Sequence, residues 1–262
     1  MVDDGSLGVD KDGGLHRFRL RRPPVNALDN DLVARLSGAL ADAVGDPDCR
    51  AVLIVSDIPG VFCAGADIRF LQSAKGADLA RFQLGVRACF SDIEAAPLPV
   101  IAAVGGTALG GGFELMLACD FALVGDNDAT RLGLPEVKLG VLPGAGGTQR
   151  LARTVGKPIA SHLIMTGGVI TPRRAYELHL AAELVDPATL SARAEALAAE
   201  LASGPLTAYQ AAKRALREAT LDGIEQGLDV ELHEAASLLD TADAREGLAA
   251  FTERRPPRYT GK

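Results

Sequence analysis

The sequence predicts an α/β protein with a helical C-terminal part. In the first half of the chain, short apolar runs alternate with stretches of helical period, and after Gly147 the pattern is nearly all helical. Strands that alternate with helices are typical of α/β architectures. Only 4% of the 262 residues are aromatic and none is Trp, so small aliphatic side chains must fill the core. This composition favours close helix packing over a β-sandwich.

The apolar runs of the first half predict buried strands. Strands are expected at residues 15–20, 51–55, 100–104 and 121–124. The last two flank a glycine-rich turn at residues 105–112, from which a helix continues to about residue 118. These segments define the α/β part of the chain.

Helices are predicted between these strands. Asp29 or Asn30 can cap a helix that Gly45 ends, and a second helical stretch runs to about Glu94. The apolar stripe of the first helix has i+4 spacing and consists of Leu32, Leu36, Leu40 and Val44. Both stretches are long enough to cover one face of a sheet.

The C-terminal part carries two further helical stripes. They consist of Leu190, Ala194, Leu197 and Leu201, and of Ile224, Leu228, Leu232, Ala235 and Leu239. Ser191, Thr207, Asp222 and Asp243 lie near the expected helix starts. We therefore expect an α/β core at residues 1–200 that carries the active site, and a helical part at residues 201–262.

Charge and composition exclude several classes of function. The net charge of −7 argues against a nucleic-acid partner, which usually requires a basic face. No apolar run approaches the length of a membrane span, and the acidic, Gly-rich start of the chain is no signal peptide. The four cysteines form no C-x-x-C pair and have no His at metal-ligand spacing, so we expect free thiols, no metal and a cytoplasmic location.

Three loops differ from the rest of the chain. They span residues 62–68, 105–114 and 134–150. Gly110, Gly111 and Gly112 lack a Cβ at a strand-to-helix turn, so a ligand can approach backbone N–H groups there. Such a turn can hold a phosphate or the developing charge of a thioester oxygen, or it can serve close helix–strand packing. The P-loop, dinucleotide-binding and nucleophile-elbow patterns are absent.

Two glutamates stand beside these glycine-rich loops. Glu114 follows the glycine run, and Glu136 lies 22 residues further on, after Pro135. A single Glu is commonly a solvated surface charge. Two carboxylates that meet in a dry cleft have their pKa values pushed apart, which supplies one acid and one base. The sequence does not by itself show that they meet.

Taken together and in order, these segments resemble the enoyl-CoA hydratase/isomerase family, the crotonases. The similarity covers about residues 14–262. The matching pieces are residues 25–28, 62–68, 99–114, 119–120, 135–136, 139–151, 166–167 and 243–254. The resemblance implies a crotonase-like spiral of ββα units with a helical C-terminal part that assembles as a homotrimer or a dimer of trimers.

The resemblance also implies roles for individual residues. The backbone N–H groups of Ala66 and Gly111 would form an oxyanion hole for the thioester oxygen, and Gly144 would help position the water or the acyl group. Residues expected to bind the acyl-CoA substrate are Ala27, Leu28, Ala64, Gly65, Asp67 and Ile68. Coenzyme A is part of that substrate, so no separate cofactor is expected.

The two glutamates decide the reaction that this resemblance implies. Hydratases of the family carry both, whereas many isomerases, hydrolases and dehalogenases lack one. We therefore expect an enoyl-CoA hydratase in which Glu114 deprotonates water and Glu136 supplies the α-proton. The alternatives are an enoyl-CoA isomerase that uses one carboxylate or another acyl-CoA enzyme of the crotonase family, a non-catalytic acyl-CoA binder and a helical scaffold protein. Incorporation of solvent oxygen separates hydration from isomerisation, and ligand binding without turnover identifies a binder.

Overall fold

Two β-sheets form the framework of the protein. A computed structural model of the chain describes residues 5–221 and 223–262. Within these residues the larger sheet has the strand order β1-β2-β3-β5-β7-β10, and the smaller sheet has the order β4-β6-β8-β9. The larger sheet consists of β1 (Leu7–Asp12), β2 (Leu15–Leu20), β3 (Ala51–Ser56), β5 (Val100–Val104), β7 (Phe121–Gly125) and β10 (Glu183–Val185). The smaller sheet consists of β4 (Val61–Cys63), β6 (Thr107–Leu109), β8 (Leu132–Gly133) and β9 (Val169–Ile170).

The chain builds both sheets by repeating one pattern, a strand in each sheet followed by a helix. β3 and β4 precede α2 (Ile68–Ser73) and α3 (Gly76–Ala95), and β5 and β6 precede α4 (Gly111–Ala118). β7 and β8 precede the 3₁₀ helix η1 (Glu136–Leu139) and α5 (Gly147–Thr166). The strands of successive units are neighbours in each sheet. The expected α/β class and the crotonase-like spiral of ββα units are therefore confirmed.

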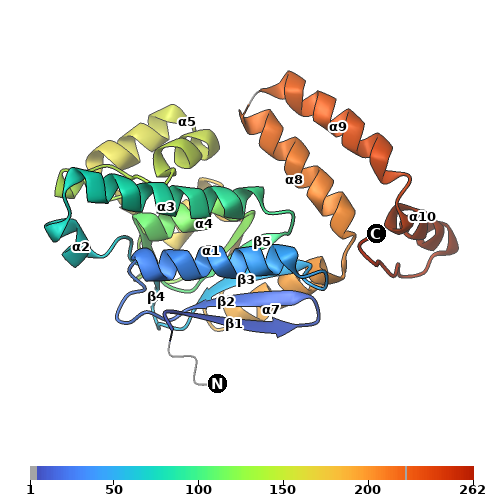
Figure 1. Ribbon diagram of the computed structural model, residues 1–262, viewed down its shortest axis with the longest axis horizontal. Coiled ribbons are helices and arrows are strands. Elements are labelled where there is room, and N and C mark those ends of the chain that lie inside the picture. Colours follow the sequence, from blue (N-terminus) through green and yellow to red (C-terminus); the bar gives the residue numbers. More distant parts are fainter. Residues whose placement is uncertain (1–4, 222) are drawn as a thin grey trace.

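Both faces of the larger sheet are buried because helices cover each of them (Figure 1). On β3, Val52 and Ile54 belong to the main core, which also contains residues of α1 (Asn30–Gly45), α3 and α4. The alternate residues Ala51 and Leu53 pack in a second core with Ala194 and other residues of α7 (Leu190–Ser203). This alternation follows from the two-residue period of a strand, whose successive side chains point to opposite faces.

The first predicted helix is confirmed with one correction. The Asp29 side chain accepts a hydrogen bond from the Leu32 N–H and caps α1. Leu32, Leu36 and Leu40 are buried as the stripe requires, but Val44 is 44% exposed and Ala43 is buried in its place. Each i+4 step rotates about 40° around an α-helix, so a strict i+4 stripe drifts off the buried face by its fourth member.

Strands 51–55, 100–104 and 121–124 are confirmed within one residue, and strand 15–20 is confirmed with its predicted ends. Strands β1, β4, β6, β8, β9 and β10 were not predicted. Most of them have two or three residues, too few for a two-residue alternation to be visible. Two of them, β9 and β10, interrupt the region after Gly147 that was expected to be nearly all helix.

The predicted helix starts of the C-terminal part are close to the observed ones. Ser191, Thr207 and Asp243 are each the second residue of a helix: α7, α8 (Leu206–Leu221) and α10 (Ala242–Glu253). Thr241 rather than Asp243 caps α10, through a hydrogen bond from the Ala244 N–H. Asp222 lies outside the described residues.

The C-terminal helices extend to one side of the two sheets (Figure 1). Helix α7 continues past residue 200 to Ser203. Helices α8 and α9 (Ile224–Leu238) then pack against each other, and Gly227 allows their close approach because a Cβ there would lie 2.6 Å from the Ala219 Cβ. Among the described residues, no helix is long and apolar enough to cross a membrane.

Candidate active site

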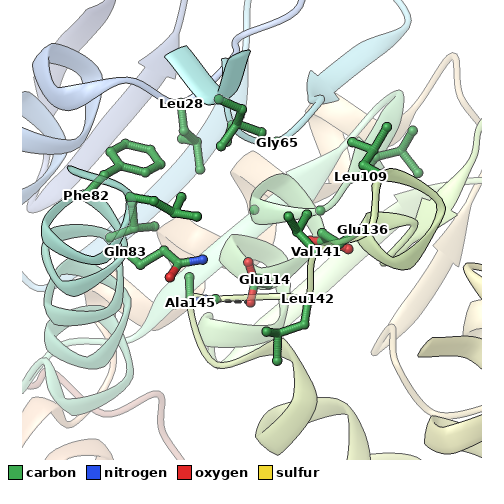
Figure 2. Close-up of a pocket in the computed structure, with 18 of the residues that line it drawn as sticks. Leu28, Gly65, Phe82, Gln83, Leu109, Glu114, Glu136, Val141, Leu142 and Ala145 are labelled. Atoms are coloured by element: carbon green, nitrogen blue, oxygen red, sulfur yellow. Dashed lines mark hydrogen bonds between the residues drawn. The ribbon is translucent and has the colours of Figure 1, made fainter. Parts of the chain in front are cut away.

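A cavity of about 200 Å³ lies where the three glycine-rich loops meet helix α3. Its wall includes residues of α3, the loop that follows β4, the start of α4, and the segment from Pro135 to Ala145. Figure 2 shows the side chains of Glu114 and Glu136 facing the same space. The loops that the sequence singled out therefore come together in one place.

Most of the predicted site residues line this cavity. They are Leu28, Ala64, Gly65, Ala66, Ile68, Gly111, Glu114, Glu136 and Gly144. Ala27 and Asp67 do not belong to its wall. The Asp67 carboxylate accepts a 2.8 Å hydrogen bond from Arg22, whose guanidinium also donates to the Ala27 carbonyl at 3.1 Å. Contact of these two residues with coenzyme A stays a prediction.

Glu114 is buried in the first turn of α4 and is only 2% exposed. Its Oε1 accepts backbone hydrogen bonds from Ala145 at 2.8 Å and from Gly147 at 2.7 Å. Burial raises the pKa of Glu114, while the two N–H donors and the positive charge of Arg150 act in the opposite direction. One carboxylate oxygen is thus fixed by the backbone, and neither N–H occupies Oε2.

A buried ion-pair network holds the loop that supplies these two donors. Arg150, which is 6% exposed, donates to the Ala145 carbonyl at 2.9 Å and to the Glu94 carboxylate at 2.7 Å. Arg153 donates to the other oxygen of Glu94 at 2.7 Å. The network connects α3 to α5 and holds the backbone at Ala145, just before α5. Because Ala145 donates to Glu114, the network also helps to fix the orientation of Glu114.

Glu136 begins the 3₁₀ helix η1 and has a different environment. Its Oε2 is buried and has no hydrogen-bond partner among the described residues. Burial raises the pKa of Glu136 to about 7, and the negative charge of Glu114 adds to this increase. The Glu136 carboxyl lies against the glycine turn, since a Cβ on Gly110 would be 3.0 Å from its Oε1. Near neutral pH, Glu136 can therefore carry a proton.

Two backbone N–H groups complete the site. Ala66 pairs with Leu28 in an isolated β-bridge, and Gly111 is the first residue of α4. Neither the Ala66 nor the Gly111 N–H donates to another group within the described part of the chain. The two loops touch, because a Cβ on Gly65 would lie 3.4 Å from the Gly111 nitrogen. Unpaired N–H groups at a helix start attract a negatively charged oxygen.

Glycine is required at two positions that shape this turn. Gly110 has φ 53° and ψ −127°, a conformation that residues with a Cβ rarely adopt. A Cβ on Gly112 would lie 2.0 Å from the Cys63 carbonyl oxygen, which no rotamer change can relieve. The glycines therefore serve close helix–strand packing and leave the Gly111 N–H accessible at the same time. The close-packing interpretation of the glycine run is confirmed, and ligand binding at this turn stays a prediction.

Sequence reasoning missed some residues that build the site. It did not identify Ala145 and Gly147 as the donors to Glu114, although the cluster of glycines there was a signal of close backbone approach. It also missed Gln83, which lines the cavity from α3. A polar residue on an amphipathic helix is expected to face solvent, so nothing in the local pattern indicated Gln83.

The arrangement combines an acid, a base and an anion-binding pair of amides. An ionised Glu114 can accept a proton, a protonated Glu136 can donate one, and the two N–H groups can stabilise charge on an oxygen between them. Such a site is suited to proton transfer beside a carbonyl compound. Its titration belongs to the two carboxyls as a coupled pair.

The spiral fold and this site define a crotonase-type protein, and comparison with known proteins agrees. The model of the family described as "Enoyl-CoA hydratase/isomerase" matches residues 10–262, so the chain belongs to this family.

Three relatives illustrate the similarity. A protein of Arabidopsis thaliana named "Probable enoyl-CoA hydratase 2, mitochondrial" is 40% identical over 252 residues, which cover 95% of this chain and 83% of the relative. The mitochondrial methylglutaconyl-CoA hydratase of Homo sapiens is 37% identical over 242 residues, which cover 90% of this chain and 70% of the relative. The crystal structure of an enoyl-CoA hydratase from Bacillus anthracis matches with a TM-score of 0.93 at 34% identity, covering 98% of this chain and all of that one.

Proposed function

We propose that this protein is an enoyl-CoA hydratase. It adds water in the syn sense across the 2,3 double bond of a trans-2-enoyl-CoA and gives a 3-hydroxyacyl-CoA. The observation that carries this proposal is the pair Glu114 and Glu136, which line one cavity in different environments: Glu114 accepts two backbone hydrogen bonds, whereas Glu136 Oε2 has no partner among the described residues. The names of the Arabidopsis and human relatives support a hydratase.

In this mechanism the thioester oxygen lies between the N–H groups of Ala66 and Gly111. These donors stabilise the enolate that forms when a nucleophile adds to C3, and removal of one such donor typically costs about 3 kcal/mol of transition-state stabilisation. Gly144 lines the cavity beside the Gln83 amide and would help position the water or the acyl group.

Each of the two carboxyls transfers one proton in the hydration reaction. Glu114, held by the Ala145 and Gly147 N–H groups, accepts a proton from water while the oxygen bonds to C3. Glu136 donates its proton to C2 of the enolate. The product thus gains one hydroxyl and one hydrogen, and transfer of the proton on Glu114 to Glu136 restores the starting state.

Hydration of crotonyl-CoA in ¹⁸O-labelled water tests the proposal. Loss of the conjugated thioester absorbance together with one ¹⁸O atom in the product supports a hydratase. An isomerase would move a double bond in a 3-enoyl-CoA without taking up ¹⁸O, and this outcome would replace our proposal by the isomerase alternative. Tight binding of crotonyl-CoA with neither reaction would identify a non-catalytic binder.

We further propose that the chain assembles as a homotrimer or a dimer of trimers. Large apolar side chains on α8, α9 and α10, and at the residue that follows α9, are exposed in the single chain: Leu216, Ile224, Leu228, Leu232, Leu239, Leu248 and Phe251. An exposed apolar surface of this kind is typical of an interface between subunits. Sedimentation velocity gives the mass, and Leu232→Asp should shift it toward the monomer. A monomeric wild-type protein would contradict the assembly.

A further inference from the structure

The side chains around the cavity are unusually uniform. Of the 21 residues in its wall, three have polar side chains: Gln83, Glu114 and Glu136. The others are aliphatic, aromatic, proline or glycine. No Lys, Arg or His belongs to the wall among the described residues. The cavity therefore combines apolar surface with two carboxyls and one neutral amide.

Three cations near the cavity wall, Arg22, Lys138 and Arg150, are engaged elsewhere. Arg150 donates to Glu94 and to the Ala145 carbonyl, behind the loop that borders the cavity. Arg22 bonds to Asp29 and Asp67. Lys138 packs its methylene chain over Gly167, where an added Cβ would lie 2.9 Å from its Cγ. None of the three can neutralise an anion inside the cavity without leaving these contacts.

Gln83 is the one neutral polar side chain of the wall. It lies on α3, one turn before Arg87, and its amide packs against the Gly144 backbone, because a Cβ there would lie 2.2 Å from Nε2. Figure 2 shows the Gln83 amide nitrogen directed into the cavity on the side where Glu114 lies. Gln83 makes no side-chain hydrogen bond within the described part of the chain. Its amide is thus free to contact a ligand.

We propose that the cavity selects acyl groups that carry no charge, and that Gln83 is the residue that sets this selectivity. The inference rests on the proposed function for the nature of the ligand, an acyl thioester. A carboxylate on the acyl group would lose its hydration among leucines and valines, face Glu114 and Glu136, and meet no cation among the described residues of the wall. An uncharged acyl chain has no charge to be desolvated when it enters the cavity, and it gains apolar contacts. Gln83 keeps the wall neutral at the one remaining polar position.

This selectivity distinguishes the substrates of two kinds of hydratase, both of which occur among the named relatives of the chain. Methylglutaconyl-CoA is an enoyl-CoA whose acyl group ends in a second carboxylate, whereas simple enoyl-CoA substrates end in a methyl group. The chain is similar to hydratases of both names. The charges of the cavity favour the second substrate class for this protein.

Binding of two saturated thioesters tests the proposal without depending on turnover. Valeryl-CoA and glutaryl-CoA have acyl groups of the same number of carbons, and the second carries a carboxylate where the first has a methyl group. Calorimetric titration of the wild-type protein should give a Kd for valeryl-CoA at least about 10-fold lower, because the carboxylate is desolvated without a partner. Equal affinity, tighter glutaryl-CoA binding, or no binding of either thioester would overturn the proposal.

Two variants at the same position test the role of Gln83. Gln83→Lys supplies the missing cation, so the preference should move toward glutaryl-CoA by about 10-fold or more. Gln83→Met has a similar length and no charge, and it should keep the wild-type preference for valeryl-CoA. A preference that is the same in all three proteins would show that Gln83 does not set it. Circular dichroism and thermal unfolding establish that each variant is folded.

The outcomes also separate this inference from the proposed function. A wild-type protein that hydrates crotonyl-CoA but binds both thioesters equally contradicts the inference alone. A protein that prefers valeryl-CoA and does not hydrate any enoyl-CoA contradicts the hydratase proposal alone.

Discussion

The Gly147 N–H donates a 2.7 Å hydrogen bond to Glu114 Oε1 across 33 positions of the sequence. It joins the first turn of α4 to the first residue of α5. With the parallel bond from Ala145, it stabilises the ionised carboxylate and fixes its orientation. The backbone at the start of α5 therefore positions Glu114, the catalytic base of the proposed reaction.

Replacement of Glu114 by Gln should abolish most of the hydratase activity. The amide has nearly the same shape but cannot accept a proton from water, and loss of a general base typically lowers kcat by about 10²- to 10⁴-fold. Crotonyl-CoA consumption measures the change. Glu225→Gln on the exposed surface of α9 is the matched control and should keep the wild-type rate. Near-wild-type hydration by Glu114→Gln would remove Glu114 from the mechanism.

The pH dependence of kcat/KM should report both carboxyls. The pKa of Glu136 is raised to about 7, so this acid loses its proton, and the rate falls, as the pH rises through that value. The rate also falls at low pH because Glu114, whose pKa is raised by burial, must be ionised. The two apparent pKa values belong to the pair.

Glu136→Gln tests the assignment of the high-pH limb. The variant has no titrating group at this position, so its residual kcat/KM should stay constant through the pH range in which the wild-type rate declines. If the decline persists unchanged, another group supplies the proton. Rates are compared at saturating and limiting crotonyl-CoA to separate kcat from kcat/KM.

Arg150 should act on the reaction through the loop it holds. Arg150→Gln removes a positive charge that lowers the pKa of Glu114 and removes the donor to the Ala145 carbonyl. The low-pH limb of kcat/KM should move to higher pH, and stability should fall by about 1–3 kcal/mol because buried groups lose their partners. Urea unfolding measures the second effect.

Arg153→Gln is the matched control for Arg150. Arg153 bonds to the same Glu94 carboxylate but is about one third exposed and does not reach the Ala145 carbonyl. Its replacement should leave the low-pH limb in place. A shift of equal size in both variants would show that Arg150 has no special relation to Glu114.

The sequence contains enough to predict the long elements of the fold. Helix α1 and the strands β3, β5 and β7 have apolar patterns that arise from burial, and burial acts on side chains that can be read directly. Strand β8 is different, because it has only two residues, Leu132 and Gly133, which are placed by backbone pairing with β6 and β9. Backbone pairing between distant segments leaves no local pattern, so such strands were missed.

The candidate site shows the same division. Glu114, Glu136, Ala66 and Gly111 were predicted because glycines and carboxylates in unusual loops, with the family resemblance, mark them. Gln83 could not be predicted, because its direction depends on where α3 lies relative to Gly144. That relation is set by tertiary packing and not by any neighbour of Gln83 in the sequence.

Gly112→Ala should damage stability and activity together. The new Cβ would lie 2.0 Å from the Cys63 carbonyl oxygen, so α4 and the end of β4 must move apart, and overpacking of this kind typically costs about 1–3 kcal/mol. Cys63 immediately precedes the loop that carries the Ala66 N–H, and Gly112 follows Gly111. The same displacement therefore separates the two N–H donors and should lower kcat for crotonyl-CoA hydration more than it changes KM.

Gly38→Ala provides the comparison that makes this prediction specific. Gly38 lies on the exposed face of α1, and a Cβ there would meet nothing within 4 Å. Alanine is the better helix former by up to about 1 kcal/mol, so this variant should be as stable as the wild type or more stable, with unchanged hydration. Urea unfolding and kcat are measured for both variants. Equal stability and equal kcat in Gly112→Ala and Gly38→Ala would mean that the contact between Gly112 and Cys63 does not hold the Ala66 and Gly111 N–H groups in position.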